Sequence, residues 1–223
     1  PDQEAKKAID NLINLGCTLQ ETREILTNEI DWRIKCGARI IVSTPREDIG
    51  ASMLIAEDLS PKVDVPVEVV PMEELEKVLS NSSNGTIVTS RYFLQPLEKV
   101  AKQHGVRAIA VDLSDFQKEL KILKELGAGS CVGIVSISPG LLRAAEVIIH
   151  SMRGSDLMLM TAISDNNSRL LSLLKTSNHI VCDWPSLSVV ENTLLKNRSQ
   201  LIRIPQIICA KNYLSIETIN QLK

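Results

Sequence analysis

The residues with the clearest chemical potential are two serines that follow a short apolar run. The run 131–135 stops at Ser136 and Ser138, and Pro139 and Gly140 follow at once. A run this short, apolar on both faces, is typical of a strand buried in a parallel sheet, and Ser-Pro-Gly is typical of the turn into a helix. Because the first N–H groups of a helix are unpaired, this turn is a candidate anion site.

Polar residues follow the other apolar runs of the chain as well. Ligands of parallel sheets bind at the carboxyl ends of the strands, so these residues are candidates for a ligand cleft. They are Ser43, Thr44, Ser90, Arg91, Asp112, Ser136, Ser138, Ser164, Asp183 and Trp184. Arg91 could pair with a carboxylate or phosphate. Each polar residue is also explained as a helix cap or turn former, and Trp184 as a packed rim residue, so both interpretations stay open.

The sequence carries no recognisable catalytic or metal-binding pattern. There is no Gly-x-Ser-x-Gly elbow, the three histidines are isolated, and no His or carboxylate cluster has metal-ligand spacing. We therefore expect no enzyme activity, no cofactor and no metal. Cys36 is a candidate for redox chemistry, because it ends a helix that could lie at a dimer interface. The alternative is that it is a small buried apolar residue, as free cysteine often is.

Composition limits the class of protein further. Hydrophobic residues make up 44% and charged residues 23%, which is ordinary for a globular chain, and the formal net charge of −2 argues against nucleic-acid binding by these 223 residues. No apolar run reaches the roughly 18 residues of a membrane span, and no signal peptide is present. Five dispersed cysteines without Cys-x-x-Cys favour a reducing compartment. We expect a cytoplasmic protein with no membrane contact.

Residues 1–37 are predicted to form a helical hairpin. Apolar residues recur there at helical spacing, Gly16 is placed to end the first helix, and Thr18-Leu19-Gln20-Glu21 is a capping box that begins the second. Two helices this short cannot bury their apolar stripes against each other alone, so we expect a homodimer. The residues expected at its interface are Ala5, Ile9, Leu12, Ile13, Leu19, Leu26 and Ile30.

From residue 38 onward, strand-like and helix-like patterns alternate. The predicted strands are 39–43, 67–70, 86–89, 107–111, 132–136, 157–163, 180–183 and 201–204. The predicted helices are 49–59, 72–79, 94–104, 116–126, 141–152, 168–175, 187–197 and 215–223. Such alternation predicts parallel sheets with right-handed crossovers. Because the segment 41–45 resembles 134–139, we expect two similar α/β lobes, 38–127 and 128–223, with a C-terminal segment that could cross back to the first lobe.

Two resemblances follow from these patterns. The hairpin, Ala5-x-x-Ala8-Ile9-x-x-Leu12-x-x-x-Gly16-Cys17-Thr18-Leu19-x-Glu21, resembles the dimerisation hairpin of the YtrA-like branch of GntR-family transcription regulators. The remainder resembles the two Rossmann-like lobes of a type I periplasmic-binding-protein fold. The combination is similar to a cyanobacterial GntR-family regulator without its DNA-binding domain.

The resemblance implies a function at the level of the whole regulator. It implies that DNA is bound only through a winged-helix domain N-terminal to Pro1, and that the protein docks onto a complex of the nitrogen sensor PII with its partner PipX. The two lobes would then be a docking platform with a filled cleft. Alternatively, they would sense a small-molecule effector in a cleft lined by Ser136, Ser138, Arg91 and Asp183. The hairpin and the missing signal peptide disfavour a third alternative, a solute-binding protein.

Overall fold

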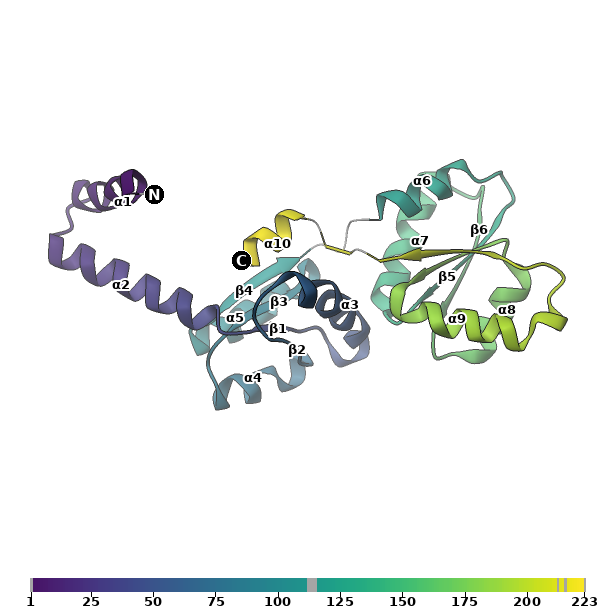
Figure 1. Cartoon of the computed structure of the whole chain (residues 1–223), viewed down its shortest axis with the longest axis horizontal. Helices are drawn as coiled ribbons and strands as arrows, with labels where there is room; N and C mark the ends of the chain where they lie inside the picture. Colours follow the sequence, from purple (N-terminus) through teal and green to yellow (C-terminus); the bar gives the residue numbers. More distant parts are fainter. Residues whose placement is uncertain (1, 112–115, 212, 215, 223) are drawn as a thin grey trace.

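The computed structural model describes residues 2–111, 116–211, 213–214 and 216–222. A helical hairpin and two α/β lobes follow one another along the long axis of the molecule (Figure 1). Each lobe holds a four-stranded, fully parallel sheet. The predicted α/β class with two Rossmann-like lobes is therefore confirmed.

The hairpin consists of α1 (Asp2–Asn14) and α2 (Leu19–Cys36) and projects from the first lobe (Figure 1). The predicted capping box begins α2: the Glu21 amide donates to Thr18 Oγ1 over 3.2 Å, and the Thr18 amide donates to the Glu21 carboxylate over 2.7 Å. At its other end α2 is fastened to lobe 1, where Trp32 Nε1 donates to the Gly105 carbonyl over 3.0 Å. The hairpin therefore leaves the body as a defined arm.

Lobe 1 is built on the strand order β2-β1-β3-β4. Its strands are β1 (Ile40–Val42), β2 (Val67–Val69), β3 (Thr86–Ser90) and β4 (Arg107–Val111). Its helices are α3 (Ile49–Leu59), α4 (Met72–Asn81) and α5 (Leu94–His104), with short 3-10 turns η1 (Arg46–Asp48), η2 (Ser60–Lys62) and η3 (Arg91–Phe93). The alternation of side chains along β1 separates two cores, Ile40 and Val42 facing α3 and Ile41 facing α4 and α5.

Lobe 2 repeats this order as β6-β5-β7-β8. Its strands are β5 (Cys131–Ser136), β6 (Met158–Ile163), β7 (His179–Asp183) and β8 (Gln206–Ala210). Its helices are α7 (Pro139–Arg153), α8 (Asn167–Thr176) and α9 (Trp184–Lys196), followed by the 3-10 turn η4 (Arg198–Gln200). Val132 and Ile134 of β5 pack with α7, whereas Val135 packs with α8 and α9.

The predicted strand at 201–204 is wrong. These residues precede Pro205, and the strand begins only at Gln206, which pairs with His179 of β7. Ile202 and Ile204 are 100% and 55% exposed, so the apolar run that suggested a strand lies on the surface. The pairing uses the next apolar run, since proline cannot donate a ladder hydrogen bond.

The lobes exchange one helix each. Helix α6 (Gln117–Glu125) follows β4 of lobe 1 but packs in lobe 2, where Leu123 joins the core beneath α7. Helix α10 (Ile216–Leu222) follows β8 of lobe 2 but packs on lobe 1, where Ile219 joins the core beside α3 (Figure 1). Helix α6 thus precedes the predicted boundary at residue 127 but contributes its apolar face to lobe 2. The two connections tie the lobes together as a pair.

Candidate functional site: the junction between the lobes

A buried carboxylate of lobe 1 binds the start of a helix in lobe 2. Asp48, 6% exposed at the start of α3, accepts hydrogen bonds from Ser138 Oγ over 2.7 Å and from the Gly140 amide over 3.2 Å. Ser138 is at the same time the N-cap of α7, where its Oγ accepts from the Leu141 amide over 3.0 Å. At the turn where the sequence predicts an anion site, the carboxylate of Asp48 accepts these hydrogen bonds from the start of α7. We name this contact of Asp48, Ser138 and Gly140 the Asp48 clasp.

Glycines let the two lobes approach at the clasp. A Cβ atom on Gly140 would lie 2.1 Å from Asp48 Oδ2, and a Cβ atom on Gly50 would lie 2.1 Å from the Ile137 carbonyl oxygen. Both distances are far below van der Waals contact. Thr44 supports the clasp from lobe 1, since its hydroxyl donates to the Asp48 carbonyl over 2.9 Å. The backbones of α3 and of the β5–α7 turn are thus in direct contact.

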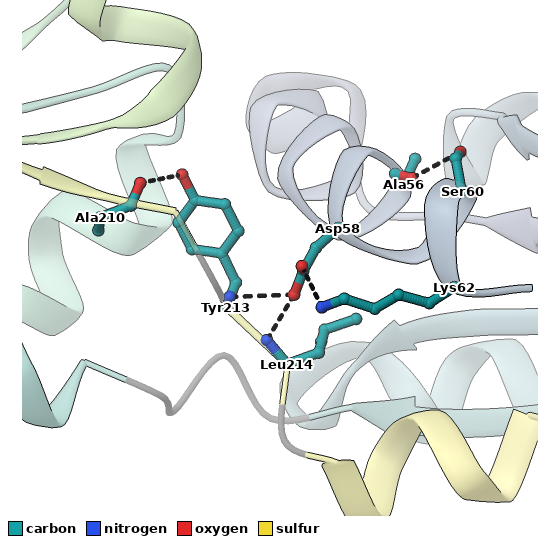
Figure 2. Close-up of polar contacts among 7 residues, drawn as sticks. All are labelled: Ala56, Asp58, Ser60, Lys62, Ala210, Tyr213 and Leu214. Carbon is teal, nitrogen blue, oxygen red and sulfur yellow. Dashed lines mark hydrogen bonds and ion pairs between the residues drawn. The ribbon is translucent and has the colours of Figure 1, made fainter.

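A second carboxylate of lobe 1 holds the strand that crosses back from lobe 2. Figure 2 shows Asp58 accepting hydrogen bonds from the Tyr213 and Leu214 amides, over 3.0 and 2.8 Å, while it also pairs with Lys62. The Tyr213 hydroxyl donates to the Ala210 carbonyl over 2.9 Å (Figure 2). Burial raises the pKa of this phenol. The C-terminal crossing is therefore fixed to both lobes by buried hydrogen bonds.

Asp183 has a structural role in the same region. Its Oδ1 accepts from the Ser186 amide over 2.9 Å and caps α9, and its Oδ2 accepts from the Ile137 amide over 2.9 Å. The neighbouring Trp184 amide donates to the Tyr213 hydroxyl over 2.8 Å, and its ring lies 4.4 Å from Lys211 Nζ. The capping interpretation therefore describes Asp183, and Trp184 is a rim residue that is 45% exposed.

Beside the clasp, a cleft of about 620 Å³ remains open between the lobes. Lobe 1 contributes Ser90 and the η3 residues Arg91, Tyr92 and Phe93 to its wall. Lobe 2 contributes one side of α7, namely Gly140, Leu141, Arg143, Ala144, Val147 and Ile148. We name this space the inter-lobe cleft. A smaller apolar cavity of about 80 Å³ lies within lobe 2, between α6, α7 and the sheet.

The predicted ligand residues are divided among these places. Ser90, Arg91 and Ser138 line the inter-lobe cleft, whereas Ser136 and Asp183 line the cavity of lobe 2. Ser43, Thr44 and Ser164 are buried and line neither space. Asp112 lies outside the described residues. The strand ends thus converge on the junction, but most of their side chains serve the fold.

Sequence reasoning missed the residues that shape the junction. Asp48, Asp58, Arg143, Tyr92 and Phe93 were assigned no role, although each lies within a few residues of a predicted strand or helix end. The partners of Asp48 come from the other lobe and those of Asp58 include the crossing segment, so no local spacing reveals them. The signal that could have been used for Arg143 is its position in the second turn of the helix that Ser138 begins.

The hairpin presents the second candidate surface. Of the predicted interface residues, Ala5, Ile13, Leu19 and Ile30 are exposed and Ile9, Leu12 and Leu26 are partly buried. Leu19 is 71% exposed and Ile30 56% exposed, which is unusual for apolar side chains along one arm. Cys36 is 3% exposed, and burial raises the pKa of its thiol, so the reactive thiolate is disfavoured there.

The described residues contain no group of three or more His, Cys, Asp or Glu side chains that could hold a metal ion. No described helix is long and apolar enough to cross a membrane. Two α/β lobes of this kind occur in proteins of many functions, so the fold by itself assigns none.

The comparison with known protein families adds an assignment for part of the chain. Residues 118–211, which comprise most of α6 and the strands and helices of lobe 2, match the family model described as the cyanobacterial PlmA-type GntR regulator C-terminal domain. This match confirms the resemblance to cyanobacterial GntR-family regulators over residues 118–211. Transcription regulators are generally non-enzymatic. No curated protein and no solved structure matches the chain.

Proposed function

We propose that the chain is the dimerisation and partner-docking part of a GntR-family transcription regulator, and that its docking partner is the PII–PipX complex. The observation that carries this proposal is the Asp48 clasp. In a ligand sensor the first N–H groups of α7 would be available to an anionic effector, but here the Gly140 N–H donates to Asp48 and the Leu141 N–H donates to Ser138 Oγ. A partner protein would then bind outside the junction, on the lobe surfaces or on the arm.

The hairpin supplies the dimer in this proposal. Its exposed apolar residues, among them Leu19 and Ile30, would be buried against a second copy of the arm. In the whole regulator, DNA would be bound by a winged-helix domain N-terminal to Pro1, so the arm would set the spacing of two DNA-binding heads. The PII–PipX assignment comes from the family resemblance.

Sedimentation velocity of this chain, alone and mixed with PII and PipX, tests the proposal. We expect a species of twice the 24.6 kDa of one chain, and a faster species when both partners are present. A matched variant, Ile30→Asp, should sediment as a monomer, while Lys102→Asp on the exposed side of α5 should remain a dimer. A monomeric wild-type chain would contradict the role of the arm, and a dimer that ignores both partners would contradict the docking.

A second function, small-molecule sensing, is favoured by one observation. The inter-lobe cleft remains open beside the clasp and is lined from both lobes. A ligand that contacts both walls would stabilise one arrangement of the lobes only through its higher affinity for that arrangement. In this proposal the effector would change the relative position of the lobes, and through the arm the spacing of the DNA-binding heads.

A further inference from the structure

The inter-lobe cleft has the dimensions of a small-molecule site. Its volume of about 620 Å³ falls within the roughly 300–1,000 Å³ that is typical of ligand pockets. Its walls are η3 of lobe 1 and the exposed side of α7 of lobe 2, and its inner end is closed by the Asp48 clasp. Protein partners, in contrast, usually need a broad surface of about 800 Å² on each side, so a concave space of this size favours a small ligand.

The charges that line the cleft favour an anion. Arg143 is exposed on the wall from α7. Arg91 lies on the wall from η3 and already interacts with another group of the chain, so we assign the anionic group to Arg143. Among the described lining residues, Asp48 is the only carboxylate, and its Oδ1 accepts from Ser138 and Gly140. Guanidinium groups bind carboxylates and phosphates through paired hydrogen bonds.

An additional hydrogen-bond donor lines the same space. The buried Ser90 hydroxyl has no hydrogen-bond partner among the described residues. Ser90 directly precedes Arg91 at the carboxyl end of β3, which is where parallel sheets place their ligand groups. A buried polar atom without a partner is costly, and a ligand oxygen could provide the partner.

Apolar side chains complete the lining and remain exposed. Tyr92 is 86% exposed, Val147 69% and Ile148 41%, and Phe93 lies beside them in the cleft. The whole chain has only two tyrosines and two phenylalanines, so a concentration of one of each in this cleft is not a general property of the surface. These side chains would gain from contact with an apolar or aromatic ligand group.

We infer that the inter-lobe cleft binds a small organic anion whose carboxylate or phosphate group is held by Arg143 and whose apolar part packs on Tyr92 and Val147. This inference rests on the sensing function proposed above and gives it a ligand class. Because Tyr92 belongs to lobe 1 and Arg143 to lobe 2, one ligand would contact both walls. Binding would then favour the arrangement of the lobes in which both walls reach the ligand.

The fluorescent probe 1-anilinonaphthalene-8-sulfonate has the required chemistry, an anionic group attached to aromatic rings. We expect saturable binding to the wild-type chain and a loss of affinity of about tenfold in Arg143→Gln, the effect of one charge-assisted contact. Arg198→Gln, an exposed arginine in η4 away from the cleft, is the matched control and should bind as wild type does. The neutral analogue N-phenyl-1-naphthylamine should not distinguish the arginine variants from wild type. Equal affinity of the wild type, Arg143→Gln and Arg198→Gln for the anionic probe would overturn the inference.

Competition identifies the anionic group. Displacement of the probe by 2-naphthoate supports a carboxylate ligand, and displacement by 1-naphthyl phosphate supports a phosphate ligand. Displacement by neither at saturating concentration would contradict the inference. If Arg143→Gln binds the probe normally but no longer sediments with PII and PipX, the cleft is a protein-docking surface and the small-molecule inference is wrong, while the docking function stands. Unchanged melting temperatures of the variants would show that they fold.

Discussion

The Asp48 clasp predicts that Gly140→Ala has opposite effects in two backgrounds. Gly140 is the second residue of α7, where alanine would normally stabilise a helix by about 0.5–1 kcal/mol. Here the added methyl group would lie 2.1 Å from Asp48 Oδ2, so the clasp must shift or break. Overpacking of this kind costs roughly 1–3 kcal/mol. We therefore expect Gly140→Ala to lower the free energy of unfolding by about 1–2 kcal/mol in the wild-type background.

Without the Asp48 carboxylate, Gly140→Ala should raise the free energy of unfolding instead of lowering it. Asp48→Ala deletes the acceptor of the 2.7 Å bond from Ser138 Oγ and of the 3.2 Å bond from the Gly140 amide. Hydrogen bonds to a buried charge contribute about 1.5–3 kcal/mol each. Because the 3.2 Å bond is longer than the 2.7 Å bond and therefore weaker, we expect the free energy of unfolding to fall by about 2–4 kcal/mol. In this background the methyl group at position 140 meets no carboxylate. The double variant should be about 0.5–1 kcal/mol more stable than Asp48→Ala alone.

Urea unfolding followed by the fluorescence of Trp32 and Trp184 measures this cycle. Gly50→Ala is the matched control: its added methyl group would meet the Ile137 carbonyl oxygen at 2.1 Å, which is a backbone atom, so Asp48→Ala should not rescue it. If Gly140→Ala stabilises the wild-type protein, or if its cost is the same with and without Asp48, the clasp is not formed and the reasoning is refuted.

Three further predictions concern the crossing strand and the arm. Tyr213→Phe removes the hydroxyl that accepts from the Trp184 amide and donates to the Ala210 carbonyl, so the free energy of unfolding should fall by about 1–3 kcal/mol in urea titrations; an unchanged midpoint would contradict these contacts. Ile30→Asp should convert the dimer to a monomer in sedimentation while its melting temperature at low concentration stays near that of the wild type, because the side chain is 56% exposed. The thiol of Cys36 is buried and its pKa is raised, so Cys36→Ser should leave dimerisation under oxidant unchanged; loss of an oxidant-dependent species in this variant would revive the redox hypothesis.

The regular elements follow from local sequence patterns. Fully buried runs such as Ile40–Val42 and Cys131–Ser136 have apolar residues on both faces, and this pattern is sufficient to predict parallel strands. The capping box at Thr18 formed as its spacing predicts. Prediction was wrong at 201–204, where two neighbouring apolar runs compete for one strand position. The choice between them depends on pairing with β7, which no local pattern contains.

The exchange of α6 and α10 shows a similar limit. Each helix follows the fourth strand of its own lobe and has an apolar face that would suit either sheet. Their position is decided by the crossing segments, of which the second is held where the Asp58 carboxylate binds the Tyr213 and Leu214 amides. Amide groups carry no sequence signature, so a helix can be predicted from its pattern while the lobe that receives it cannot.

The sequence by itself determined the α/β class, the two lobes, the arm and the collection of polar residues at the strand ends, because these depend on periodicity and on neighbours a few residues away. The tertiary structure alone decided which of those polar residues remain for a partner. Ser138 caps the start of α7, and its hydroxyl donates to Asp48, ninety residues earlier in the chain. Arg143 and Tyr92 line the open cleft because the fold places α7 and η3 on its two walls. Whether a charged or polar group is already satisfied depends on what the fold brings within hydrogen-bonding distance.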